Sequence, residues 1–177
     1  MEDEVSRMNV LIGDMLELAK YESGTYKMDV GSFYIDTLIE RVCTKLTPDF
    51  EAKRLLLSTS LIPALVEGNE RRIEQVIVNF LTNAISYTPE HESILVTTSE
   101  ERDTVQICIE NKGAHIPDEQ LGKNMGPFLP RGNLPPPVDR RDGAGSCHLP
   151  KKFLEMHGAA YGVNNTSDGV MFYFSIE

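Results

Sequence analysis

The sequence lacks a hydrophobic run long enough to cross a membrane. No apolar stretch approaches the ~18 residues that a spanning helix needs. The first residues are acidic, whereas a secretion signal has a basic start followed by an apolar stretch. We therefore expect a cytoplasmic chain, and the anchor of any membrane-bound parent protein would lie outside this sequence.

Paired cysteines and an excess of positive charge are also missing. Cys43, Cys108 and Cys147 are far apart and form no CxxC pair, which argues against a disulfide framework or a zinc site and fits a reducing cytosol. The 17 basic and 27 acidic residues give a net charge of -10, which a phosphate backbone would repel. Nucleic acid is therefore not an expected partner.

The chain has enough apolar content for one domain and one additional helix. Its 177 residues are 41% hydrophobic, sufficient for a single core. Near the N-terminus, apolar residues recur at alternating steps of three and four and predict a helix that ends near Ser23-Gly24: Val5, Met8, Ile12, Met15 and Ala19. Its narrow apolar seam needs a partner, either a second copy in a homodimer through residues 1–23 or the chain's own domain.

The remaining patterns predict an α+β fold. We expect helices at Phe33–Glu51, Asn69–Tyr87 and Lys151–His157, and strands at Arg54–Ser60, Ser93–Ser99, Thr104–Glu110, Ala160–Asn164 and Val170–Ile176. The segment 122–145 holds five prolines and five glycines in 24 residues, which is typical of a loop. The predicted architecture is a two-layer α/β sandwich, a mixed and mostly antiparallel sheet with helices covering one face.

The helix predicted at 69–87 carries the clearest chemical signal. Asn79, Asn83 and Tyr87 are spaced four apart and form a polar stripe beside a continuous apolar face. Asparagine offers a carbonyl oxygen to a hard cation and an amide to a phosphate, so the stripe suits a magnesium–nucleotide complex. The alternative is that these are ordinary solvated asparagines.

The surrounding sequence resembles sensor histidine kinases, members of a wider ATPase family that includes gyrase, a heat-shock chaperone and mismatch-repair proteins. RRIEQVIVNFLTNAISYTP resembles their N-box, and IENKGAHIPDEQL their first glycine box. KKFLEMHGAAYGV resembles the helix and strand after the second glycine box, and DGVMFYFSI the closing strand with the third. EVSRMNVLIGDMLELAKYESG resembles the second helix of the dimerisation stem. The resemblance implies part of a stem at residues 1–28 and a Bergerat-type ATP-binding catalytic domain at 29–177.

The resemblance also implies roles for individual residues. Asn83 would be the magnesium ligand, Asn79 would support the phosphates, and Tyr87 would lie near the nucleotide. Asn111 stands where the family has an acidic residue that reads the adenine amino group, Gly113 would let the backbone approach the base, and Ile116 belongs to the same box. ATP-hydrolysing members carry a glutamate as general base at the position of Asn79, so hydrolysis is disfavoured here, which argues against an ATP-driven switch.

The implied activity is transfer of the γ-phosphoryl group of ATP to a histidine of the stem, which this sequence does not contain. The implied partners are ATP and ADP, the phosphoacceptor helix of the full-length kinase and a cognate response regulator, within a membrane-anchored bacterial sensor kinase. Ser86 departs from the family, which usually has a basic residue there.

The segment 122–150, which corresponds to the ATP lid, also departs from the family pattern. Phe128 and Arg131 are its remnants of the phenylalanine-rich box, and Gly143 and Gly145 are remnants of the second glycine box, one place off register. The alternative function is therefore a catalytically impaired module that acts through dimerisation or response-regulator docking.

Overall fold

The structure, a computed structural model, describes residues 30–116 and 160–177. The predicted stem helix, the altered lid at 122–150 and the short helix predicted at 151–157 lie outside these residues. Among the helices described, none is long and apolar enough to span a membrane.

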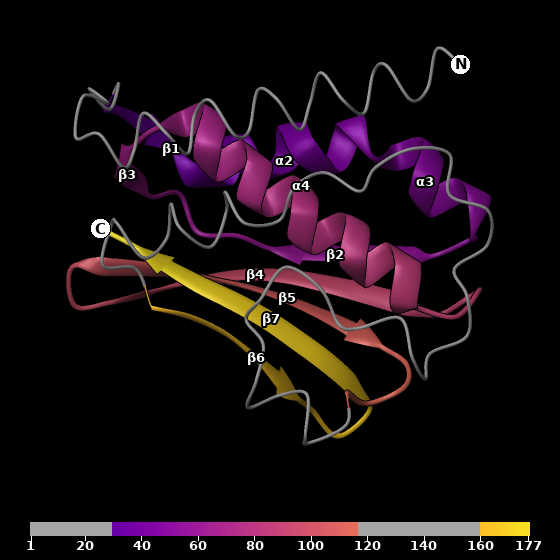
Figure 1. Ribbon diagram of the computed structural model, residues 1–177. Helices are drawn as coiled ribbons and strands as arrows, with labels where there is room; N and C mark the ends of the chain where they lie inside the picture. Colours follow the sequence, from indigo (N-terminus) through magenta and orange to yellow (C-terminus); the bar gives the residue numbers. More distant parts are fainter. Residues whose placement is uncertain (1–29, 117–159) are drawn as a thin grey trace, which may run out of the picture.

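A five-stranded sheet forms one layer of the molecule (Figure 1). Its spatial order is β2-β4-β5-β7-β6, with bounds of Leu56–Ser60, Ser93–Glu101, Thr104–Lys112, Gly169–Ile176 and Tyr161–Asn165 respectively. Strands β2 and β4 are parallel and are joined through a helix, whereas the other neighbours are antiparallel. The mixed, mostly antiparallel sheet and both predicted hairpins are thus confirmed.

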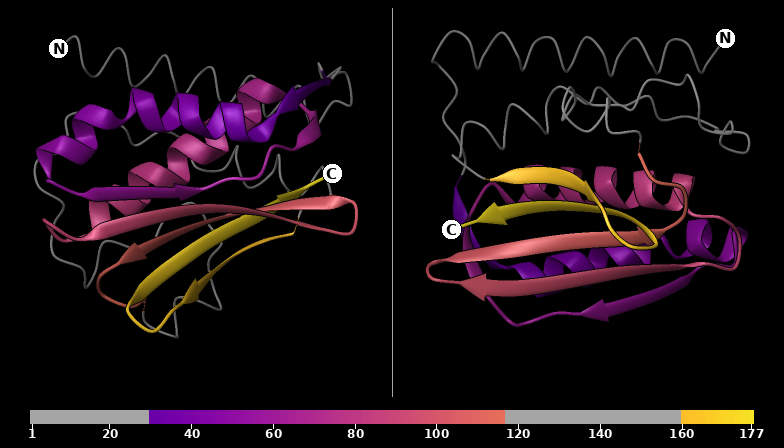
Figure 2. Two further views of the ribbon diagram at one scale, coloured as in Figure 1. Left: turned by 180° about the vertical axis from the view of Figure 1, so that it is seen from behind. Right: turned by 90° about the horizontal axis from the view of Figure 1, so that it is seen from below.

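Three helices cover one face of this sheet (Figures 1 and 2). They are α2 (Ile35–Lys45), α3 (Thr47–Ala52) and α4 (Glu70–Tyr87). The prediction of one continuous helix at 33–51 was wrong. The first helix ends before Leu46, and α3 begins after it with Pro48 in its first turn. Proline has no backbone N–H to continue the hydrogen-bond ladder of α2, but it is tolerated where a helix begins.

A second, two-stranded sheet was not predicted. It pairs β1 (Gly31–Tyr34) with β3 (Leu65–Gly68) in antiparallel register, so Phe33, predicted to be helical, lies in a strand opposite Val66. Strands of four residues are too short to show a reliable alternation of apolar and polar positions. The backbone N–H of Glu67 donates to the carbonyl of Glu177 at 3.0 Å, which ties this small sheet to the end of β7.

Helix α4 lies across the sheet, with its apolar face as the centre of the core. All seven residues of the predicted face are buried: Ile73, Val76, Ile77, Phe80, Leu81, Ala84 and Ile85. The ring of Phe80 packs against Phe172 at 5.7 Å and Phe174 at 5.9 Å between ring centroids, both on β7. Each large apolar side chain buried in this way contributes about 1.5–3 kcal/mol. This packing sets the position of the polar stripe on the same helix.

Candidate functional site

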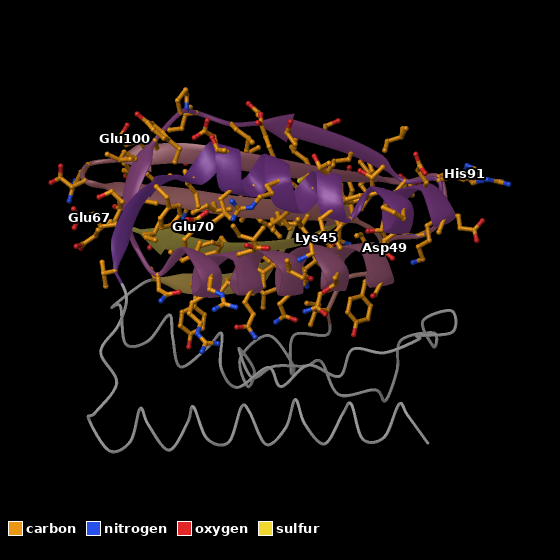
Figure 3. The ribbon with its side chains drawn as sticks, turned by 90° about the horizontal axis from the view of Figure 1, so that it is seen from above. Lys45, Asp49, Glu67, Glu70, His91 and Glu100 are labelled. Atoms are coloured by element: carbon orange, nitrogen blue, oxygen red, sulfur yellow. The ribbon has the colours of Figure 1, made fainter. Side chains whose placement is uncertain are left out.

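The polar stripe of α4 lies on the side of the helix that is turned away from α2. Glu70 and Glu74 face α2, where Arg41 bonds to them at 2.9 and 3.1 Å, and Figure 3 shows Glu70 and Lys45 in the seam between the two helices. Asn79 follows Glu70 by about two and a half turns, which places it on the opposite side. Asn79 and Asn83 are half-buried, and among the described residues neither side-chain amide has a hydrogen-bond partner. Their bonding capacity is available to a ligand.

The C-terminal end of α4 is held by Lys53, from the turn before β2. Its Nζ donates to the carbonyls of Ile85 at 2.8 Å, Ser86 at 3.0 Å and Thr88 at 2.9 Å. A cation at this end of a helix satisfies carbonyls that have no partner within the helix and is favoured by the helix dipole. Lys53 was not identified from the sequence, because no local pattern links this lysine to the end of a helix that lies 32 residues later.

Gly113 brings the end of β5 against the end of α4. Its φ of +149° is a conformation that side chains disfavour, and an added Cβ would lie 3.0 Å from the Tyr87 carbonyl oxygen and 3.2 Å from Pro89 Cδ. Its N–H donates to the carbonyl of Asp168 at 3.0 Å. The structure therefore brings together Tyr87 and Gly113, two predicted site residues that are distant in sequence.

Asn111, on β5 just before this point, has an unsatisfied polar atom. The residue is 1% exposed, yet within residues 30–116 and 160–177 its buried Oδ1 has no hydrogen-bond partner. Its Nδ2 donates to the carbonyl of Lys112 at 3.4 Å, which is a long hydrogen bond. A buried acceptor without a partner costs about 1–3 kcal/mol. Such an atom, beside a glycine that admits no side chain, fits a ligand that donates a hydrogen bond.

The end of β5, with Asn111 and Gly113, and the end of α4, with Tyr87, meet in what we call the corner. Two residues that were not selected from the sequence hold the other side of this corner. Asn165 accepts from the N–H of Ile116 and donates to its carbonyl, both at 2.8 Å, so the predicted site residue Ile116 is anchored to the β6–β7 hairpin. Gly169 begins β7 opposite Lys112, and an added Cβ would collide with the Asn111 carbonyl at 1.8 Å. A turn was predicted here, but its contact with β5 is visible only in three dimensions.

The remaining candidates add little to the corner. The hydroxyl of Ser86 donates to Thr82 O at 2.7 Å on its own helix. Burial raises the pKa of the Cys43 thiol to about 11 and also raises the pKa of Cys108, so both are neutral at pH 7. Within the described ranges no group of three His, Cys, Asp or Glu side chains is arranged to hold a metal ion. Phe128, Arg131, Gly143 and Gly145 lie outside the described residues.

Comparison with known proteins agrees with this geometry. The sequence profile of the "Histidine kinase-, DNA gyrase B-, and HSP90-like ATPase" family matches residues 68–177. The alginate biosynthesis sensor protein KinB of Pseudomonas aeruginosa is 30% identical over 98% of the chain, and the probable sensor kinase SilS of Salmonella typhimurium is 29% identical over 98%. The chain spans only 29% and 36% of these two proteins, about a third of their length.

Solved structures have the same fold. The nucleotide-free catalytic domain of histidine kinase ThkA superposes with a TM-score of 0.72 at 26% identity, covering 84% of this chain and 96% of that domain. ThkA in complex with the response regulator TrrA superposes with a TM-score of 0.74 at 24% identity, covering 99% of this chain and 48% of that one. The profile covers more than half of the chain and includes all of α4, β5 and the β6–β7 hairpin. The chain therefore belongs to the histidine kinase-, DNA gyrase B- and HSP90-like ATPase family.

Proposed function

We propose that this chain is the ATP-binding catalytic domain of a two-component sensor histidine kinase, preceded at residues 1–28 by part of the dimerisation stem. Its reaction is transfer of the γ-phosphoryl group of ATP to a stem histidine that lies outside this sequence. The relatives that span the whole chain are sensor kinases, which supports this choice within the family.

The observation that carries the proposal is the corner between α4 and β5. The buried Oδ1 of Asn111 has no donor among the described residues, and the adenine amino group would supply one. Gly113 keeps the neighbouring backbone free of a side chain, so that the flat base can approach it. Tyr87 lies beside this corner at the end of α4, and Ile116 is fixed across from it.

Asn83 and Asn79 are the proposed phosphate end of the site. They lie one and two turns before Tyr87 on the same stripe, so a nucleotide whose base lies at Asn111 would extend its phosphates along α4. Asn83 would hold Mg²⁺ through its amide oxygen, and Asn79 would support the phosphates with its NH₂ group. Mg²⁺, when bound, would neutralise phosphate charge. Phe128, Arg131, Gly143 and Gly145 are proposed to complete the site from the lid.

Asn79 also favours phosphoryl transfer over hydrolysis. A general base must take a proton from the attacking water, and an amide cannot do so at neutral pH. The acceptor would instead be brought by the rest of the kinase, with catalysis by positioning and charge neutralisation. For this chain we therefore propose slow ATP hydrolysis and rapid transfer only when a phosphoacceptor helix is supplied.

The proposed partners follow from this role. ThkA has been solved in complex with a response regulator, which supports a cognate response regulator as the downstream partner here. The proposed location is the cytoplasm, as part of a membrane-anchored kinase. Homodimerisation through residues 1–23 remains a proposal that light scattering across a concentration series would test.

The decisive experiment is calorimetric titration of the chain with the imido-bridged ATP analogue, with and without magnesium. We expect magnesium-dependent binding that weakens at least tenfold in Asn83→Ala, equivalent to a loss of about 1.4 kcal/mol. Asn164→Ala, at an exposed asparagine of β6, is the matched control and should bind like the wild type. Absence of binding in all three proteins would contradict the proposal and favour a scaffold or docking module.

A further inference from the structure

We propose that the base site of this chain accepts 6-oxopurine nucleotides as well as adenine nucleotides, because its buried reading group, Asn111, is an amide. This inference rests on the proposed function, since it concerns how the same nucleotide site selects its base. It identifies the substrate class as purine nucleotides with either an amino or an oxo group at position 6.

An amide and a carboxylate read a base edge differently. At neutral pH a carboxylate only accepts hydrogen bonds, whereas an asparagine side chain carries an acceptor oxygen and a donor NH₂ on one carbon. Rotation of the amide by half a turn exchanges these two groups. The 6-amino group of adenine donates and the 6-oxo group of hypoxanthine accepts, so one amide is complementary to each base in one of its two orientations.

The protein holds the amide in its observed orientation only weakly. Nδ2 donates to the Lys112 carbonyl at 3.4 Å, near the outer limit for a hydrogen bond, and Oδ1 has no partner in the part of the chain that the structure describes. Rotation would lose that one long bond and turn Oδ1 toward the carbonyl, an unfavourable arrangement of two acceptors. The observed orientation, which suits adenine, is therefore favoured, but only by the strength of one poor hydrogen bond.

On the two adjacent strands, the residues paired with Asn111 carry no charge that would fix the amide in one orientation. Its partners on the adjacent strands are Ile94 and Val170, both buried and apolar. An added Cβ on Gly113 would lie 3.8 Å from Nδ2, so the glycine places no side-chain atom against the amide. The adjacent residue Lys112 forms an ion pair with Asp168 at 3.8 Å, and both of these side chains are exposed. We therefore expect a preference for adenine of less than about tenfold, the factor that corresponds to one ordinary hydrogen bond.

The test is competition calorimetry with ATP and inosine triphosphate (ITP), both with magnesium. ITP differs from ATP at the read edge and lacks the 2-amino group of guanine, which would need additional room. The wild-type chain should bind ITP within about tenfold of ATP. Asn111→Asp keeps the shape of the side chain but only accepts hydrogen bonds, so the ATP-to-ITP affinity ratio should rise at least tenfold.

Three results would overturn the proposal. The first is wild-type binding of ATP with no ITP binding at a hundredfold higher concentration, which would leave the proposed function intact. The second is an ATP-to-ITP ratio that is the same in Asn111→Asp, verified as folded by circular dichroism, because another group would then read the base. The third is failure of both nucleotides to bind the wild type, in which case the proposed function fails as well.

Discussion

At the N-terminal end of α4, the side chains of Asn69, Glu70 and Glu74 have hydrogen-bond partners, whereas at the C-terminal end the described residues include a buried acceptor without one. The Asn69 side chain caps the first turn by accepting from the Arg72 N–H at 3.1 Å, and Arg41 joins Glu70 and Glu74 to α2. At the other end Lys53 donates to the last carbonyls of the helix, but the buried Oδ1 of Asn111, on β5, has no partner among the residues described.

The two ends also differ in burial. The Arg41 pairs are surface contacts, since the arginine side chain is 52% exposed and the carboxylates are 44% and 26% exposed. Such pairs add little stability and serve mainly to orient α2 against α4. At the C-terminal end the side chain of Asn111 is buried, so the hydrogen bond that its Oδ1 lacks among the described residues is costly in the absence of ligand. This difference supports the proposal that the nucleotide binds at the C-terminal end of α4.

The largest effect is expected from Gly169→Ala, which pushes β7 away from β5 next to Asn111. Gly169→Ala would place a Cβ against the backbone of β5, 1.8 Å from the Asn111 carbonyl oxygen, where no side-chain rotation can relieve the clash. We expect a loss of about 3 kcal/mol in the free energy of unfolding, measured by urea denaturation. Nucleotide affinity should fall as well, because the strand that carries Asn111 must shift.

Gly31→Ala is the matched control, since an added Cβ on β1 has nothing within 4 Å. Its unfolding free energy should stay within about 0.5 kcal/mol of the wild type. Equal urea midpoints for the two alanine variants would mean that the β5–β7 contact at the corner is not as tight as the structure has it.

A smaller effect is expected when the cation is removed from the C-terminal end. Lys53→Met keeps most of the length of the side chain but removes the three charge-assisted bonds to the carbonyls of Ile85 and Ser86 in α4 and of Thr88 just after it. We expect the free energy of unfolding to fall by about 2 kcal/mol. Because the same bonds fix the position of Tyr87, the affinity for ATP should also fall severalfold. Urea denaturation and calorimetry measure the two effects separately.

The same substitution at the other end provides the comparison. Lys45→Met removes an exposed ion pair with Glu74 of 3.5 Å. We expect the free energy of unfolding to fall by less than about 0.5 kcal/mol and the affinity for ATP to stay unchanged. If Lys45→Met altered ATP affinity as much as Lys53→Met, the functional difference between the two ends of α4 would not exist.

The elements with a long and regular pattern were predictable from sequence. The apolar face of α4 repeats over the whole helix, and its asparagine cap precedes it, so both the extent of the helix and its start at Asn69 are confirmed. The strands of the two hairpins alternate clearly and were predicted to within about two residues, with β4 and β5 extending slightly further than expected. Local periodicity carries this information because each burial pattern repeats along its own element.

The contacts that build the corner were not predictable in the same way. Lys53 and Asn165 act on residues 32 and 49 positions away, at Ile85 and Ile116, and nothing in their own neighbourhood signals this. The break between α2 and α3 was missed because the apolar pattern runs through Leu46, although Pro48 was a local sign. Asn111 and Gly113 were selected only through the family resemblance, since burial of an unpaired oxygen is a property of the folded chain.

Apart from the control variants, the smallest effect is expected at the N-terminal end of α4, from loss of the Arg41 ion pairs. Arg41→Met removes bonds of 2.9 and 3.1 Å to Glu70 and Glu74. Because all three side chains are partly solvated, we expect the free energy of unfolding to fall by only about 0.5 kcal/mol. The loss should shrink as salt is raised from 0.05 to about 1 M, because the screening length then falls to about 3 Å. A loss near that of Lys53→Met, or one insensitive to salt, would show that this end is held as firmly as the buried one. Unchanged ATP affinity in Arg41→Met, beside the weakened affinity of Lys53→Met, would confine the function of α4 to its C-terminal half.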